Sequence, residues 1–115
     1  MSYPTPARID MSKYLIEEKA FFTCRDKFFE ASKVAKFFGI SRSAIRKFIM
    51  QDVFFSARAV KKKTYYKWYI AKWEVNNILK QKFNDGERIG YTGVYQTAKF
   101  LKMQYELNHK ANFYP

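Results

Sequence analysis

The sequence is poor in the residues that build disulfides, zinc sites and phosphate-binding loops. It contains one cysteine, Cys24, and one histidine, His109, and its four glycines form no glycine-rich loop. One cysteine cannot form an internal disulfide, and one cysteine with one histidine cannot supply the four ligands of a structural zinc site. A phosphate-binding loop of the P-loop or dinucleotide kind is also missing. We therefore expect no cofactor, no metal site and a reducing compartment.

Long apolar runs are missing as well. No run approaches the ~20 consecutive apolar residues that span a bilayer. The first ten residues, MSYPTPARID, lack the apolar core of a signal peptide and carry two prolines that favour an extended arm. These absences predict a cytoplasmic protein that is not bound to a membrane.

Acidic residues are scarce. The chain holds 10 Asp and Glu against 22 Lys and Arg, for a formal charge of +12, and residues 30–82 hold thirteen basic residues against three acidic ones. Two-metal catalysis needs several converging carboxylates, so we expect no enzymatic activity. A charge of +10 within this one segment instead indicates a polyanionic partner, with nucleic acid favoured over an anionic membrane surface.

The sequence does contain enough apolar surface for a folded domain. Of its 115 residues, 48% are hydrophobic and 20% are aromatic, which suits a single domain with a modest core. We divide residues 1–115 into an N-terminal arm and helix (1–29), a basic core (30–83), and a connector with a C-terminal helix (84–115).

The segment Glu30 to Gln51, EASKVAKFFGISRSAIRKFIMQ, has the pattern of a helix-turn-helix. Its apolar residues form two stripes at helical spacing, one before Gly39 and one after it. Gly39 can take the positive φ that ends the first helix, and Ser41 can cap the second. The residues predicted to face the core are Val34, Ala35, Phe38, Ile45, Phe48 and Ile49.

The outward face of the second helix is basic. Arginine can pair with a base edge through two hydrogen bonds, and basic side chains also bind phosphate. The alternative is an ordinary helical hairpin with a solvated basic face, although such faces usually mix charges of both signs. The candidate DNA contacts on this helix are Ser41, Arg42, Ser43, Arg46, Lys47 and Gln51.

The residues after the second helix predict a β-hairpin. Val53–Val60 and Tyr65–Ile70 are rich in β-branched and aromatic residues, and Lys61–Thr64 forms a basic tip between them. A hairpin that follows a recognition helix is typical of a wing, which lies on the DNA backbone or in the minor groove; turns also tolerate lysine without any ligand. By strand alternation, Tyr66, Trp68 and Ile70 should face the core. The candidate contacts on the hairpin are Arg58, Lys61, Lys62, Lys63 and Lys67.

Helical spacing recurs on either side of this core. An N-terminal helix is expected from Asp10 or Ser12, and a closing helix is expected over 71–83 with Asn84-Asp85-Gly86 as its stop. The expected apolar face of the first helix is Met11, Tyr14, Leu15, Phe21 and Phe22, with Glu18 beside it, and that of the closing helix is Ala71, Val75, Ile78 and Leu79.

The C-terminal segment predicts one more amphipathic helix. It follows a connector that contains Gly90 and Gly93, and its apolar face is Val94, Ala98, Leu101 and Tyr105. Two arrangements are open for this helix. It either folds back onto the domain or joins the N-terminal helix in a homodimer.

The order of these elements resembles a known family. VAKFFGISRSAIRKFI, a two-stranded wing and the closing WYIAKWEVNNIL resemble the excisionase and MerR-like winged helix-turn-helix domains over about Phe28 to Gln81. The family pattern is similar to "evAkllGiSrstirrli". The resemblance implies a DNA-binding module in which Arg42, Ser43, Arg46 and Lys47 match the recognition helix and Lys61 to Lys63 match the wing. The coiled coil and effector-binding cysteines of the metal-responsive members are missing, so no small-molecule effector is expected.

The expected fold is therefore mainly α with a small β-hairpin (α+β), as a winged helix-turn-helix with extra N- and C-terminal helices. The expected function is sequence-preferring binding of double-stranded DNA by a nucleoid-associated transcriptional regulator. It would act as a homodimer or as several copies on repeated sites, since a single module of ~600–1,000 Å² seldom gives high specificity. One alternative is an architectural factor of mobile DNA, either an excisionase or a plasmid centromere-binding protein. Another is an RNA-binding module that stacks bases on Tyr65, Tyr69 and Trp73.

Overall fold

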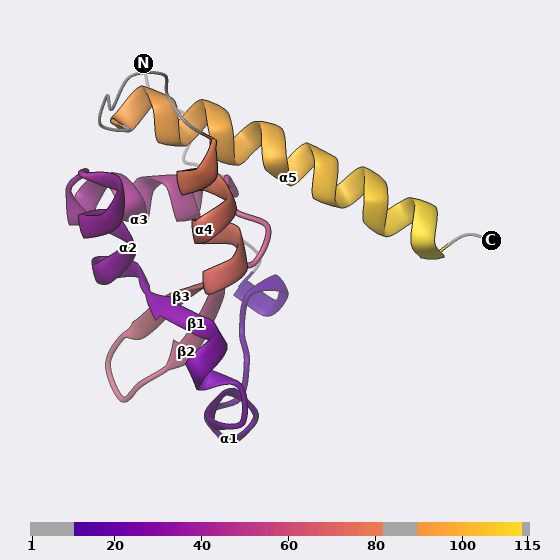
Figure 1. Ribbon diagram of the computed structural model, residues 1–115. Helices are drawn as coiled ribbons and strands as arrows, with labels where there is room; N and C mark the ends of the chain where they lie inside the picture. The colour runs from indigo at the N-terminus through magenta and orange to yellow at the C-terminus, as the bar shows by residue number, and fades with distance from the viewer. Residues whose placement is uncertain (1–10, 82–89, 114–115) are drawn as a thin grey trace, which may run out of the picture.

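A computed structural model describes residues 11–81 and 90–113. The chain is mostly helical, with one small three-stranded antiparallel sheet (Figure 1), so the expected α+β class is confirmed. The elements are η1 (Met11–Lys13), α1 (Glu18–Phe22), η2 (Arg25–Lys27), β1 (Phe28–Glu30), α2 (Ala31–Phe38), α3 (Arg42–Met50), β2 (Arg58–Lys61), β3 (Tyr66–Ala71), α4 (Lys72–Lys80) and α5 (Tyr91–Phe113). The expected N-terminal arm and the Asn84-Asp85-Gly86 stop lie outside the described residues.

The sheet has the order β1-β3-β2, with β3 in the centre. Strands β2 and β3 form the expected hairpin, in which Arg58 pairs with Tyr69 and Lys61 pairs with Tyr66. Strand β1 pairs with the other edge of β3 and places Glu30 opposite Tyr69. The first hairpin strand is shorter than expected, because regular pairing begins at Arg58 and the preceding residues form a loop.

The two basic helices end and begin as their sequence predicts. Gly39 has φ 70°, and its N–H and that of Ile40 bond back to Lys36 and Ala35 in the last turn of α2, which is the left-handed closure that favours glycine. Ser41 then caps α3 by accepting a 3.0 Å hydrogen bond from the N–H of Ala44. The steep junction between α2 and α3 is therefore set by local backbone chemistry.

The main core lies between the four larger helices and one face of the sheet. All six residues predicted to face it from α2 and α3 are buried, as are Trp68 and Ile70 of β3. Tyr66 is 38% exposed, so its placement on the core face was wrong; β3 runs past the end of the core. Tyr69, which was expected to face outward, is also buried, because the N-terminal segment covers the second face of the sheet.

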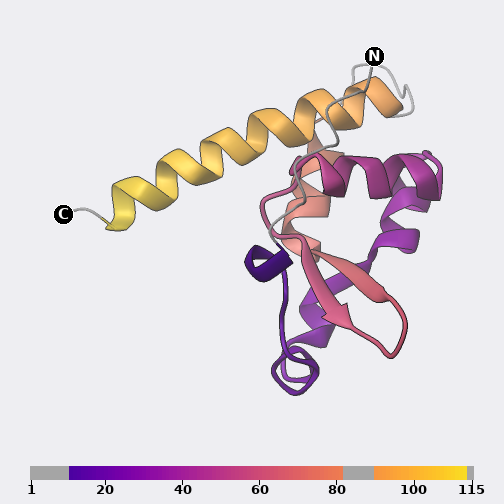
Figure 2. The same ribbon diagram turned by 180° about the vertical axis from the view of Figure 1, so that it is seen from behind.

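The N-terminal segment is not one continuous helix. Leu15 instead forms a parallel bridge with Ala59, where the N–H of Ala59 donates to the carbonyl of Tyr14 at 2.8 Å. Figure 2 shows this segment running beside the sheet between η1 and α1. The edge of β2 offers backbone groups that need partners, and pairing with them outweighs the helical preference of the segment. Phe21 of α1 then packs on Tyr69 in a small second core.

Helix α4 closes the core but differs from its expected form. Val75 and Ile78 are buried as predicted, whereas Leu79 is 39% exposed, so its inward placement was wrong. The helix ends at Lys80. Its best-buried polar residue is Glu74, whose carboxylate accepts the N–H groups of Phe55 and Ser56, each at 2.8 Å. Glu74 thereby fixes the loop that leads into the hairpin.

Helix α5 packs on the domain from its start to Tyr105 and extends past it with its last turns (Figure 1). Val94 and Ala98 are fully buried, and Leu101 is nearly so, so the predicted apolar face is confirmed. Gly93 lies inside the helix and not in a connector. The hydroxyl of Tyr105 accepts a 3.2 Å hydrogen bond from Asn77 of α4. The part of α5 up to Tyr105 therefore folds back onto the same domain.

Candidate nucleic-acid interface

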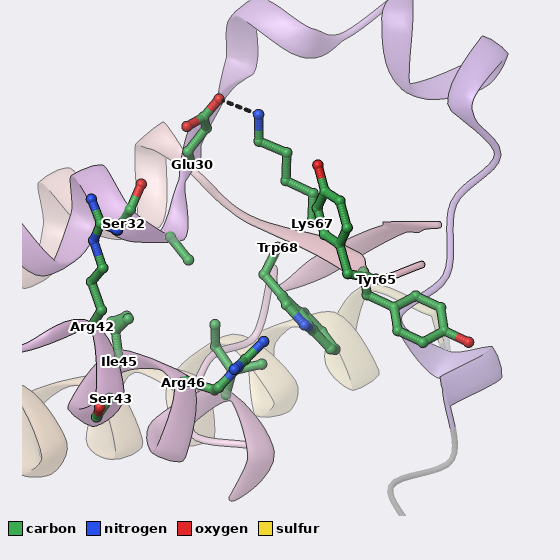
Figure 3. Close-up of a pocket in the computed structure, with 12 residues that line it drawn as sticks. Glu30, Ser32, Arg42, Ser43, Ile45, Arg46, Tyr65, Lys67 and Trp68 are labelled. Atoms are coloured by element: carbon green, nitrogen blue, oxygen red, sulfur yellow. Dashed lines mark ion pairs between the residues drawn. The ribbon is translucent and has the colours of Figure 1, made fainter. Parts of the chain in front are cut away.

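A groove of about 410 Å³ lies between α3, the start of α2 and the hairpin. In Figure 3, Arg42 and Arg46 extend from α3 on one side, while Tyr65 and Lys67 stand on β3 and its preceding turn on the other. The lining residues are Glu30, Ala31, Ser32, Arg42, Ser43, Ile45, Arg46, Ile49, Tyr65, Tyr66, Lys67 and Trp68. The groove therefore brings together one helix face and one hairpin strand that are separate in sequence.

The α3 side of the groove carries its candidate base contacts. Ile45 and Ile49 are buried in the core, which fixes the rotation of α3 and turns Arg42, Ser43 and Arg46 toward the groove. Within the described residues, neither arginine forms an ion pair. Both guanidinium groups therefore keep their donors available to a ligand.

Lys47 and Gln51 belong to α3 but do not line this groove. Lys47 is exposed, and Gln51 ends the helix as its C-cap residue. Ser41 uses its hydroxyl oxygen to cap α3. Of the candidates on this helix, the groove gathers Arg42, Ser43 and Arg46.

Two hairpin lysines are already paired with carboxylates. Lys67 lies 2.8 Å from Glu30, and their hydrogen bond raises the pKa of Lys67 and lowers the pKa of Glu30. Lys62 lies 2.6 Å from Glu18 of α1, and that bond lowers the pKa of the Glu18 carboxyl. Lys61 and Lys63 are exposed and, among the residues described, have no ion-pair partner. Among the described residues, the hairpin lysines without an ion-pair partner are therefore Lys61 and Lys63.

Arg58 does not reach the groove. It pairs with Tyr69 in the sheet, and its side chain donates to the carbonyl of Ala57 at 2.8 Å. Residues paired across neighbouring strands share a face, so Arg58 lies on the face that Phe21 and the N-terminal segment cover. Arg58 therefore lies outside the groove, on the face of the sheet that also carries Lys62 and Lys67.

Several groove residues were not among the predicted DNA contacts. Tyr65, which was predicted only as a stacking residue for RNA, and Tyr66 are 57% and 38% exposed, and both line the groove together with Ser32. The aromatic pair beside a basic turn was the available signal, but strand alternation placed one tyrosine in the core. The pairing of Glu30 with Lys67 had no local signal, because the two residues meet only through the sheet.

The C-terminal end of α3 is held by an ionic cluster around Asp52. Its carboxylate accepts 2.7 Å hydrogen bonds from both Lys13 and Lys102, and a third from the hydroxyl of Tyr14. Partial burial acts to raise the pKa of Asp52, but these hydrogen bonds outweigh it and hold the pKa below its ordinary value. Burial and the bond to Asp52 raise the pKa of Tyr14. The cluster fixes α3 against η1 and α5.

In the part of the chain that the structure describes, no group of His, Cys, Asp and Glu side chains forms a metal-binding arrangement. No described helix combines the length and apolar character needed to cross a membrane. Comparison of the chain with models of protein families, with curated proteins and with solved structures gives no match.

Proposed function

We propose that the chain binds double-stranded DNA with sequence preference, as a winged helix-turn-helix. The observation that carries this proposal is the groove in which Arg42, Ser43 and Arg46 project from one helix face without ionic partners among the described residues. Buried apolar residues hold that face in one orientation. A rigid helix with free donors on its outer side is suited to the major groove of B-DNA.

The roles of the α3 side chains follow from their chemistry. Arg42 and Arg46 are one helical turn apart, so both can reach base edges on the same side of the helix. Arginine can donate two hydrogen bonds to one guanine, and Ser43 can donate to or accept from a base or a phosphate. Lys47 is exposed outside the groove, and in this proposal it contacts the phosphate backbone.

The hairpin supplies the second part of the interface. Lys61 and Lys63 lie at its tip, one on each side of the paired Lys62. In this proposal the tip contacts phosphates, or enters the minor groove, next to the major groove that α3 occupies. These contacts contribute affinity without reading the sequence.

The resemblance of Phe28 to Gln81 to excisionase and MerR-like domains supports the same assignment. It favours a transcriptional regulator, with an architectural factor of mobile DNA as the alternative. In either role, two copies or several copies on repeated sites would increase specificity beyond that of one module. Footprinting combined with the measured stoichiometry separates these roles, because cooperative filling of repeats indicates the architectural factor.

A second candidate function is binding of single-stranded RNA. It is favoured by Tyr65 and Tyr66, two exposed rings that line the groove and could stack on bases. Tyr69, which was expected to join them, is buried. Trp73 is 44% exposed, but its ring packs against Tyr105 at a centroid distance of 4.9 Å. The stacking surface is therefore smaller than the sequence suggested.

Selection of bound sequences from a random duplex pool tests the DNA proposal. The wild-type protein should enrich a common motif, and the double variant Arg42→Ala and Arg46→Ala should lose that enrichment while remaining folded. Lys99→Ala, a charge removal on α5, is the control and should select the same motif. Preferential displacement of labelled duplex by single-stranded RNA would instead support the RNA-binding function.

A further inference from the structure

A second basic cluster lies beyond the Glu30–Lys67 pair. Arg25, Lys33 and Lys72 come from η2, α2 and α4 and line a hollow of about 350 Å³ together with Phe28, Phe29, Glu30 and Tyr69. The fold thus brings Lys72 beside two cations from a much earlier part of the sequence.

The ring of Phe29 lies near two of these cations. The Nζ of Lys72 lies 5.1 Å from the ring centroid, and the Nζ of Lys33 lies 5.8 Å from it. Both distances allow an attractive cation–π interaction. The ring therefore interacts with two ammonium groups that come from different helices.

The nearby carboxylate compensates the cluster only in part, since Arg25 and Lys33, like Lys67, help to lower the pKa of Glu30. Glu30 lines the hollow, but its carboxylate is paired with Lys67 at 2.8 Å. Among the described residues, neither Arg25 nor Lys33 nor Lys72 has an ion-pair partner. Arg25, Lys33, Lys72 and Lys67 share this one carboxylate, so a net positive charge remains that attracts an anion.

The hollow and the groove beside α3 share one lining residue, Glu30. Lys67, the ion-pair partner of Glu30, lines the groove. A polyanion that occupies the groove and continues past this pair therefore meets Arg25, Lys33 and Lys72 next.

We propose that Arg25, Lys33 and Lys72 form a second phosphate-binding site, which holds the sugar-phosphate backbone of DNA flanking the segment that α3 reads. This inference rests on the proposed DNA-binding function and extends its interface. Ammonium groups on flexible stems bind phosphate without distinguishing bases. The site therefore contributes affinity that is independent of sequence and sensitive to salt.

The test compares two double variants that each remove two positive charges. Lys33→Gln with Lys72→Gln neutralises the cluster and keeps long side chains over Phe29. Lys80→Gln with Lys99→Gln is the control, in which Lys99 likewise lies 5.4 Å from a ring centroid, that of Tyr95. Circular dichroism and thermal unfolding establish that each variant is folded. Binding is measured by fluorescence anisotropy on a preferred and a random duplex over a range of salt concentrations.

The cluster variant should weaken binding to both duplexes by the same factor. Each lost phosphate contact reduces the slope of log K against log salt by about 0.9, so the slope should fall by about 1.8 for two contacts. The control should change the slope by less than the amount expected for one phosphate contact, about 0.9. Equal slopes and affinities for the two double variants would overturn the inference.

The outcome also separates this inference from the function on which it rests. If wild-type protein binds the duplex and the cluster variant binds equally well, the second phosphate-binding site is refuted and the DNA-binding proposal is unaffected. If wild-type protein binds neither duplex, the DNA-binding function fails and the second site fails with it. An Arg25→Gln substitution added to the cluster variant should reduce the slope by about 0.9 more.

Discussion

Lys102 of α5 donates from its Nζ both to the carboxylate of Asp52, at 2.7 Å, and to the main-chain carbonyl of Asp52, at 2.6 Å. Asp52 has φ 59° and ends α3, while the N–H groups of Asp52 and Val53 bond back into its last turn. Gly39 ends α2 in the same left-handed closure. The second closure uses an aspartate whose side chain anchors α5, which offsets the strain of positive φ.

Replacement of Asp52 by glycine separates these two roles. Glycine keeps the left-handed closure without strain but removes the acceptor of Lys13, Tyr14 and Lys102. We expect a loss of about 1–2 kcal/mol in the free energy of unfolding, since hydrogen bonds to charged groups are worth ~1.5–3 kcal/mol and this carboxylate is partly exposed. Amide exchange should accelerate in α5 before α3. Asp52→Asn, which tolerates positive φ and keeps one acceptor, should lose less; unchanged stability of the glycine variant would refute the anchor.

The contribution of Asp52 should also depend on pH. Its pKa is lower in the folded protein than its ordinary value of 3.8, so the stabilisation is fully present above that value and is lost as pH falls through the folded pKa. The stability difference between wild type and Asp52→Asn should be constant near neutral pH and shrink below about pH 4. Denaturant titrations from pH 7 to pH 3 measure it, and a difference that grows in acid would contradict the shift.

Removal of the Glu74 carboxylate should destabilise the fold strongly. Glu74→Ala leaves the N–H groups of Phe55 and Ser56 and the Ser56 hydroxyl without the acceptor they use now, and we expect a cost of about 2–4 kcal/mol. Glu74→Gln keeps one oxygen and should cost less. Burial raises the pKa of Glu74 against the opposing bonds from Ser56 and Phe55. The contribution of Glu74 to the free energy of unfolding therefore falls as pH rises and the carboxyl ionises. This pH dependence is opposite to that of Asp52. Chemical denaturation measures this loss. If Glu74→Ala is as stable as the wild-type protein, contacts other than those of Glu74 hold the loop.

The two parts of the proposed interface should respond differently to substitution. Arg46→Ala should cost about 1–3 kcal/mol on the preferred duplex and less on random DNA, because it removes a base contact. Lys63→Ala should weaken both duplexes alike and reduce the salt slope by about 0.9. Equal losses for Arg46→Ala on both duplexes would make Arg46 a phosphate contact, and a silent Lys63→Ala would remove the hairpin tip from the interface.

The elements set by local chemistry could be predicted from the sequence. The ends of α2 and α3 follow from Gly39 and Ser41, which act on backbone groups within one turn. The buried faces of both helices follow from residue spacing, and so does the α3 side of the groove.

The features that depend on distant partners could not be predicted. Residues 11–22 have helical spacing, but the edge of β2 captures Leu15 through backbone pairing. Lys67 was predicted to contact DNA, and its ion pair with Glu30 could not be predicted because the two residues meet only through the sheet. The second basic cluster could not be predicted for the same reason, because no short window of sequence contains Arg25, Lys33 and Lys72 together.

The position of β1 has a consequence for the kinetics of folding. Strand β2 meets β3 across a short turn, whereas β1 pairs with β3 by closing a loop that contains α2 and α3. Longer closures cost more chain entropy, so we expect β1 to join the sheet late. Phe29→Ala in β1 should then speed unfolding more than it slows refolding, and stopped-flow measurements that find the reverse would place β1 in the folding nucleus. The lifetime of the folded basic surface on α2 and α3 would thus depend on β1, a strand of three residues that precedes α2 in the sequence.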